Sequence, residues 1–140
     1  MISQDKLQQL AVGLNGATGY TGLKFQVDQV PGETEAVRVT LQDREEFPIY
    51  IMVDDNQILC MTYLWKESEI DPAKRTLLLE ALLTMNIPMP LSAFSKVGNQ
   101  YVIFGALSIH FSINEIIEEV EILSDNTLMV IEELEAYLLH

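Results

Sequence analysis

The sequence predicts an α+β fold, in which helices pack on a mostly antiparallel, twisted sheet of about five or six strands, in the order α-β-β-β-β-α-β-β-α. Three segments carry apolar residues at the three- and four-residue spacing of a helix, and six shorter segments are apolar at every second residue or throughout. Turn residues join the shorter segments too closely for parallel crossovers. No linker or repeat divides the chain, so we expect residues 1–140 to form a single α+β domain.

The first helix is predicted from an apolar repeat near the start of the chain. Ser3 is positioned as its N-cap, and the expected buried face comprises Leu7, Leu10, Ala11 and Leu14. The segment that follows, NGATGYTG at residues 15–22, has three glycines spaced by three. It lacks the Gly-Lys-Ser/Thr ending of a phosphate loop and does not lead from a strand into a helix. We therefore interpret it as a flexible connection.

Four strands are predicted before the middle of the chain. They are residues 23–27, 37–41, 47–53 and 58–65. Pro31 and Gly32 are expected to turn an antiparallel hairpin between the first two strands, and residues 54–56 form the turn before the fourth. The fourth strand is apolar on both sides of its pleat. We expect it either to be central in the sheet or to expose one apolar face to a partner.

The middle helix has a well-defined start, because Asp71 is an N-cap residue and Pro72 suits the first helical position. Its predicted buried face consists of Leu77, Leu78, Ala81, Leu82 and Met85. The sequence NIPMP at residues 86–90 ends this helix. Residues 91–97 and 100–107 then form a second predicted hairpin, which turns at Gly98 and Asn99.

The last quarter, from Ser112 to His140, is predicted to be one long amphipathic helix that covers the sheet. Ser112 and Glu115 have the spacing of a capping box, in which each side chain accepts a hydrogen bond from the backbone N–H of the other. About 26 residues would give a helix of about 39 Å. Its acidic residues are expected outside the buried stripe: Glu115, Glu118, Glu119, Glu121, Asp125, Glu132 and Glu133.

The charge balance narrows the class of partner. The formal charge is −13, from 21 acids against 8 bases, and this argues against nucleic acid or an anionic membrane surface. The acidity serves either solubility or the steering of a basic protein segment. The single cysteine excludes an intramolecular disulfide, and the apolar runs are too short to cross a bilayer, so we expect a cytoplasmic protein without membrane insertion.

The supply of catalytic or ligating side chains is small. His110 and His140 are the only histidines, Cys60 lies inside a predicted strand, and Asp54 and Asp55 are explained by turn chemistry. We therefore expect no catalytic residues, no cofactor and no metal site. The alternative is an enzyme or small-molecule binder with a pocket near the Pro88–Leu91 turn. Its polar groups would be Tyr63, Ser92, Ser95 and His110.

Two surfaces are candidates for contact with another polypeptide. On the final helix, Ile122, Met129 and Ala136 recur every seven residues among the acids, which suits helix packing against a partner or a second copy of the chain. On the fourth strand, Ile58, Cys60 and Leu64 are candidates for an exposed sheet face. A protein partner or client segment is thus more consistent with the residues than a small substrate.

Four segments resemble the YjfI family of uncharacterised bacterial proteins. They are FPIYIMVDDNQILCMTYLW at 47–65, PMPLSAFSKVG at 88–98, YVIFGALS at 101–108 and EVEILSDNTLMVIEEL at 119–134. The resemblance implies a cytoplasmic bacterial protein with no assigned catalytic residues. Members are often encoded beside a homologue of phage shock protein A, an envelope-stress coiled-coil protein, which implies a candidate partner.

The element order is also similar to the type III secretion chaperone fold, which YbjN-like proteins share. Those chaperones are small, acidic, commonly dimeric proteins that bind extended segments of their clients. The sequence departs from that fold in having four predicted strands before the middle helix, where three are usual. The function that we predict is a non-catalytic protein-binding module, either chaperone-like or an adaptor in envelope-stress regulation.

Overall fold

Six antiparallel strands form one sheet with the spatial order β1-β2-β3-β4-β6-β5 in the computed structural model, which describes residues 2–30 and 36–140. The strands are β1 Phe25–Gln29, β2 Ala36–Leu41, β3 Ile49–Val53, β4 Gln57–Lys66, β5 Ala93–Val97 and β6 Gln100–Ser108. The helices are α1 Ile2–Leu14, α2 Arg75–Met85 and α3 Ile113–Glu133, with 3₁₀ turns η1 Glu67–Glu69, η2 Pro72–Lys74 and η3 Glu135–Tyr137. The predicted α+β class and element order are confirmed.

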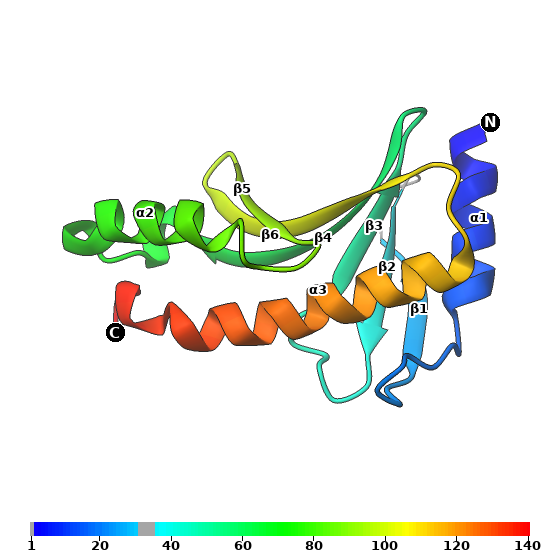
Figure 1. Ribbon diagram of the computed structural model, residues 1–140, viewed down its shortest axis with the longest axis horizontal. Coiled ribbons are helices and arrows are strands. Elements are labelled where there is room, and N and C mark those ends of the chain that lie inside the picture. The colour runs from blue at the N-terminus through cyan, green and yellow to red at the C-terminus, as the bar shows by residue number, and fades with distance from the viewer. Residues whose placement is uncertain (1, 31–35) are drawn as a thin grey trace.

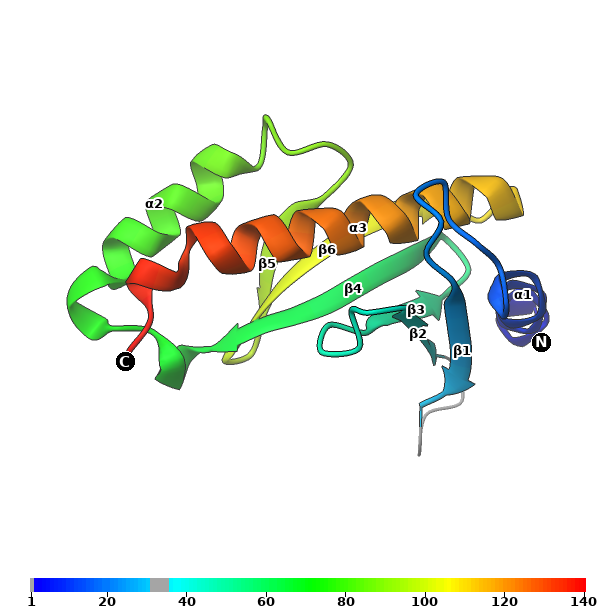
Figure 2. The same cartoon turned by 90° about the horizontal axis from the view of Figure 1, so that it is seen from below.

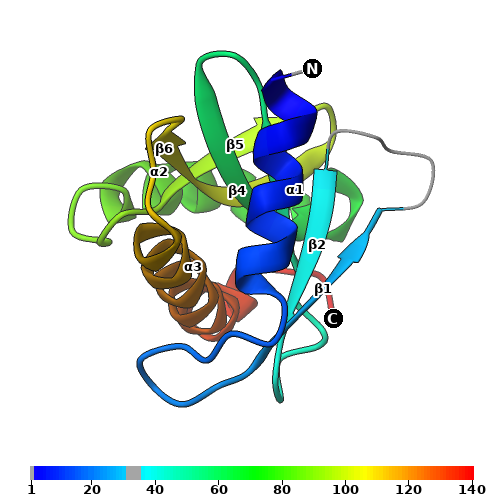
Figure 3. The ribbon, with the colours of Figure 1, turned by 90° about the vertical axis from the view of Figure 1, so that its right-hand side faces the viewer.

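Helices α1 and α3 pack on one face of the sheet, which we call the inner face. Helix α3 runs nearly the length of the molecule and contacts β4 and β6, while α1 contacts β1, β2 and β3 (Figure 1). The sheet and α3 form two layers, with α1 across one end and α2 at the other (Figure 2). Figure 3 shows α1 from its solvent side, beside β1 and β2. The opposite, outer face of the sheet carries no helix from the described residues.

The core lies between the inner face of the sheet and helices α1 and α3. Alternate residues of each strand point inward, so β2 and β3 bury Val37, Val39, Leu41, Ile49, Ile51 and Val53. Helix α1 contributes Leu7, Leu10 and Leu14, as predicted, and α3 contributes Ile116, Val120 and Leu123. Strand β4 is central, between β3 and β6, which agrees with one of the two expectations for it.

Local signals at the helix ends are partly confirmed. Ser112 Oγ accepts from the Glu115 N–H at 3.2 Å and Glu115 Oε1 accepts from the Ser112 N–H at 3.1 Å, so the capping box is present. Asp71 caps a 3₁₀ turn instead of the α-helix, which begins only at Arg75. The N-cap at Ser3 is wrong, because α1 already includes Ile2. The turn at Pro31 and Gly32 lies outside the described residues.

Two predictions about the later helices are corrected. Helix α3 ends at Glu133, because η3 turns the chain back toward the start of α2, where Ile70 pairs with Leu138. On α2, Leu78 and Leu82 are buried but Leu77 is 60% exposed. One residue turns a helix by about 100°, and no described element covers the side of α2 on which Leu77 lies.

Candidate functional site

The outer face of the sheet is apolar and only half covered. Opposite residues of paired strands point to the same side, and on this face Tyr50 opposes Met61 and Met52 opposes Leu59. These four side chains are half-buried, and Tyr63 of β4 is 50% exposed. Monomeric proteins rarely leave a contiguous apolar face open to water without a function for it. The outer face is therefore the candidate functional site.

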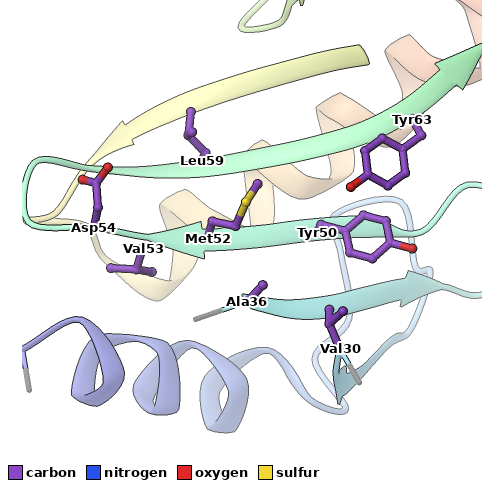
Figure 4. Close-up of a pocket in the computed structure, with 8 residues that line it drawn as sticks. All are labelled: Val30, Ala36, Tyr50, Met52, Val53, Asp54, Leu59 and Tyr63. Atoms are coloured by element: carbon purple, nitrogen blue, oxygen red, sulfur yellow. The ribbon is translucent and has the colours of Figure 1, made fainter. Parts of the chain in front are cut away.

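A shallow pocket of about 500 Å³ lies on this face (Figure 4). Its lining residues are Val30, Ala36, Tyr50, Met52, Val53, Asp54, Leu59 and Tyr63. The rings of Tyr50 and Tyr63 lie on neighbouring strands with centroids 5.1 Å apart and planes tilted by 37°. Aromatic and thioether side chains of this kind give an adaptable apolar surface with hydroxyl groups at its rim.

One charged residue, Asp54, is among those that line the pocket. Asp54 lies at its β3–β4 end, where one carboxylate oxygen accepts from the N–H groups of Asn56 and Gln57 at 2.7 and 2.9 Å. This contact confirms the turn predicted at residues 54–56. Arg38, on the outer side of β2, already donates to Asp28 at 3.0 Å. Asp54, which is exposed, therefore places a negative charge at this end of the pocket.

The predicted exposed sheet face is corrected by the structure. Ile58 and Cys60 have no exposed surface, because they point inward beneath α3, and Leu64 is half-buried. The other side of the same strand, with Leu59, Met61 and Tyr63, is the open one. Burial also raises the pKa of the Cys60 thiol, as does the nearby Glu119, so this cysteine is held as an inert thiol.

The three residues of the predicted seam lie on two elements, α3 and η3. Ile122 is half-buried and Met129 is 38% exposed, and both lie on the outward side of α3. Ala136 lies in η3, beyond the end of α3, and its carbonyl accepts from Lys74 Nζ at 2.9 Å. The seven-residue spacing therefore does not continue along one helix to Ala136. Contact with a partner through Ile122 and Met129 stays a prediction.

The polar groups of the alternative pocket do not converge. Ser92 is buried and its Oγ accepts from Asn126 Nδ2 at 2.9 Å, on the inner side of the sheet. Tyr63 and Ser95 point outward from β4 and β5 on either side of Val102, and His110 follows the far end of β6. Within residues 2–30 and 36–140, no three or more His, Cys, Asp or Glu side chains are placed to hold a metal ion.

A charged cluster near α2 is structural in character. The carboxylate of Glu67 accepts from Lys96 at 2.7 Å, from Arg75 at 3.1 Å and from the Tyr101 hydroxyl at 3.0 Å. These donors, Lys96 first, lower the pKa of Glu67 to about 2, so it stays ionised. Because its charge is satisfied by three neighbours, Glu67 fastens η1 to the β5–β6 hairpin and to α2 and is not free to act on a ligand.

Sequence reasoning missed two buried acids on α3. Glu119 and Glu121 are 3% and 5% exposed, although both were expected outside the buried stripe. Residues 15–22, which we call the glycine segment, bind the carboxylate of Glu121. It accepts from the N–H groups of Tyr20 and Thr21 at 3.0 and 3.1 Å and from the Thr21 hydroxyl at 2.8 Å. A Cβ at Gly19 would overlap this carboxylate. The segment interpreted as a flexible connection therefore binds an anion that belongs to the same chain.

Comparisons with known proteins identify a family and a shared fold. The family described as "Uncharacterized protein conserved in bacteria (DUF2170)" matches residues 4–138. The fold is similar to that of YbjN from E. coli, with TM-score 0.63 and 19% identity over 97% of this chain and 94% of that one. No curated protein matches the sequence at a significant level.

Two further solved structures with this fold are complexes. One is the ExoU–SpcU heterodimer of the type III secretion system of Pseudomonas aeruginosa, with TM-score 0.55 and 12% identity over 94% of this chain and 96% of that one. The other is the Yersinia pestis type III secretion chaperone SycH bound to a stable fragment of YscM2, with TM-score 0.52 and 15% identity over 91% and 98%. The chain thus has the fold predicted from its element order. The finer resemblance to the YjfI family stays a prediction.

Proposed function

The chain belongs to the bacterial family described as DUF2170, and we propose that it is a non-catalytic module that binds an extended segment of another protein on the outer face of its sheet. The observation that carries this proposal is the open apolar surface of β3 and β4, with its pocket between Tyr50, Met52, Leu59 and Tyr63. The same fold occurs in SycH bound to a fragment of YscM2 and in the complex of SpcU with ExoU.

The chemistry of the pocket specifies the occupant. Its lining is apolar apart from Asp54 and the tyrosine hydroxyls, so the bound segment should present aliphatic or aromatic side chains to Met52 and Leu59. A basic residue of the segment would lie at the Asp54 end. The overall charge of −13 favours approach of a basic segment as well.

The first candidate for the partner is a coiled-coil protein of the phage shock protein A type, as the resemblance to the YjfI family implies. In that case the protein acts as an adaptor in envelope-stress regulation, and with a secreted client it acts as a chaperone. We also propose that the protein is located in the cytoplasm and that it forms a homodimer. Within the described residues, no helix is both long and apolar enough to cross a membrane.

Site-specific photo-crosslinking tests the location of the bound segment. A photoreactive phenylalanine derivative is placed at Tyr63 on the outer face, at Met129 on the predicted seam, or at Gln8, which is exposed on α1. Each protein is mixed with the purified phage shock protein A homologue, and separately with lysate from the parent bacterium. We expect adducts from Tyr63 and none from Gln8. Adducts from Met129 alone would move the interface to α3, and adducts only with itself would indicate a homodimer.

Affinity measurements then test the pocket directly. The double variant Leu59→Glu with Tyr63→Glu places two charges on a half-exposed surface, so it should fold while binding the partner at least about tenfold more weakly. The matched control is Gln8→Glu, which adds a charge on α1. The Kd is measured by calorimetry with the purified partner that the crosslinking experiment identifies. An unchanged Kd in the double variant would contradict the proposed site.

A further inference from the structure

Glu119 is a buried acid with an unusual environment. Its side chain leaves α3 toward β6, where a Cβ atom at Gly105 would overlap the Glu119 carboxyl group. The same Cβ would lie 3.0 Å from the carbonyl oxygen of Leu91. The carboxyl group and the Leu91 carbonyl therefore border the same small space above Gly105, which exists only because residue 105 has no side chain.

No donor among the described residues forms a hydrogen bond with the Glu119 carboxyl group. Its ionisable neighbours are Glu118 on the same helix and Cys60 on β4. Residues 86–92 contain no charged side chain, and on β5 and β6 Lys96 and Tyr101 are bound to Glu67. Burial, followed by the charge of Glu118, raises the pKa of Glu119 to about 7.

The segment that faces Glu119 is held at a few points. Asn126 lies on α3, about two helix turns beyond Glu119. Its Nδ2 donates to the Pro90 carbonyl and to Ser92 Oγ, both at 2.9 Å. Asn86 Oδ1 accepts from the Phe94 N–H at 2.9 Å. Leu91 itself has a φ of +63°, a conformation that residues with side chains rarely adopt. Residues 86–92 therefore form a strap over α3 that is held by these side-chain contacts and by one helical hydrogen bond, from the Met89 N–H to the Met85 carbonyl at 3.2 Å.

We propose that Glu119 is a proton-controlled latch for the strap formed by residues 86–92. When protonated, the carboxyl group is a donor, and the Leu91 carbonyl is the acceptor that borders the same space. When the proton leaves to solvent, a carboxylate and a carbonyl oxygen border the same space, and no hydrogen-bond donor of the described residues reaches the carboxylate. Two acceptors that border one space repel each other, so deprotonation favours the opened strap, in which water can donate to both.

The opened strap changes the surface next to α2. Met89 is buried in the closed form, and Ile87 and Leu91 are already largely exposed on either side of it. Opening would join these three side chains into one apolar patch. The latch thus gives the protein a surface that depends on pH near neutrality and lies apart from the pocket on the outer face.

Hydrogen–deuterium exchange measured by mass spectrometry tests the latch. Exchange of residues 86–92 is followed from pH 5.5 to 9 in the wild type, in Glu119→Gln and in the exposed neighbour Glu118→Gln, with correction for the intrinsic rate at each pH. We expect protection of the wild-type strap to fall by up to about tenfold per pH unit from pH 5.5 to 7 and to level off above 7, because the pKa of Glu119 is about 7 in the closed form. Glu119→Gln should abolish this dependence, and Glu118→Gln should keep it.

An equal pH dependence in wild type and Glu119→Gln, or no dependence in the wild type, would overturn the proposal. If Glu119→Gln fails to fold, carbon-13 NMR titration of the Glu119 carboxyl group in the wild type decides alone. A titration near pH 7 that coincides with shifts in the amides of residues 86–92 supports the latch. An ordinary titration near pH 4 to 5 rejects it.

Discussion

Glu119 and Glu121 stand two residues apart on α3, are equally buried, and have opposite surroundings. Glu121 receives three hydrogen bonds from Tyr20 and Thr21, whereas Glu119 lies over Gly105 with no donor among the described residues. The pKa of Glu119 rises to about 7 because burial there is not compensated. A buried acid stabilises a fold only when another segment supplies donors for its charge.

The difference comes from the partner segments and not from the helix. On α3, Glu121 faces the glycine segment, and Glu119 faces the strap of residues 86–92. Residues 19–22 present backbone N–H groups because glycine allows the chain to curl around an anion. The strap has prolines at 88 and 90, which have no N–H to donate. Four substitutions test this comparison.

Glu121→Ala should have the largest effect. It removes three charge-assisted hydrogen bonds and leaves the donors of Tyr20 and Thr21 without their acceptor, so we expect the free energy of unfolding to fall by about 3 kcal/mol. Urea unfolding followed by circular dichroism measures this loss. The control is Glu132→Ala, on the exposed side of the same helix. A loss as small as that of the control would show that the glycine segment does not depend on this carboxylate.

Gly105→Ala should destabilise by about 2 kcal/mol, because the new Cβ overlaps the Glu119 carboxyl group and approaches the Leu91 carbonyl. Part of this loss should disappear when Glu119 is also replaced by alanine, which removes the overlapping atoms. A double-mutant cycle should therefore give a coupling energy of about 1 kcal/mol. Strictly additive losses would mean that the two side chains do not compete for the same space.

Glu119→Gln should raise the free energy of unfolding by about 1 to 2 kcal/mol at pH 8 and leave it nearly unchanged below pH 4.5. The folded-state pKa of about 7 lies above the unfolded value, so the unfolded state releases its proton first as the pH rises. Wild-type stability from this group therefore falls between about pH 4.5 and 7 and is constant above. Urea midpoints across this range check the sign, and a variant less stable than the wild type at pH 8 would contradict it.

Glu118→Gln should have the smallest effect, less than about 0.5 kcal/mol, because this side chain is exposed to water. Its charge is the second cause of the raised pKa of Glu119. The variant should therefore shift the carboxyl titration of Glu119 slightly downward in carbon-13 NMR. A shift that removes more than half of the rise from 4.5 to about 7 would mean that charge repulsion, and not burial, dominates the pKa of Glu119.

Sequence patterns predicted the elements well because their causes are local. The alternation in residues 37–41 and the apolar run in residues 100–107 identified strands that the structure confirms as β2 and β6, and Ser112 with Glu115 identified the start of α3. The candidate site was predicted only in part. The apolar run from Ile58 to Trp65 identified the correct strand, but Ile58 and Cys60 belong to its covered face. Nothing along a strand that is apolar on both sides shows which side the helices will cover.

By itself the sequence determined the number and order of the strands and helices, the acidic surface and the scarcity of catalytic groups, because these depend on residue types and on spacings of a few positions. Only the tertiary structure decided which face of β4 is open, which acids of α3 are buried, and that the glycine segment holds Glu121. Those outcomes depend on contacts between residues about 100 positions apart in the chain, such as Thr21 and Glu121. No local pattern records such contacts.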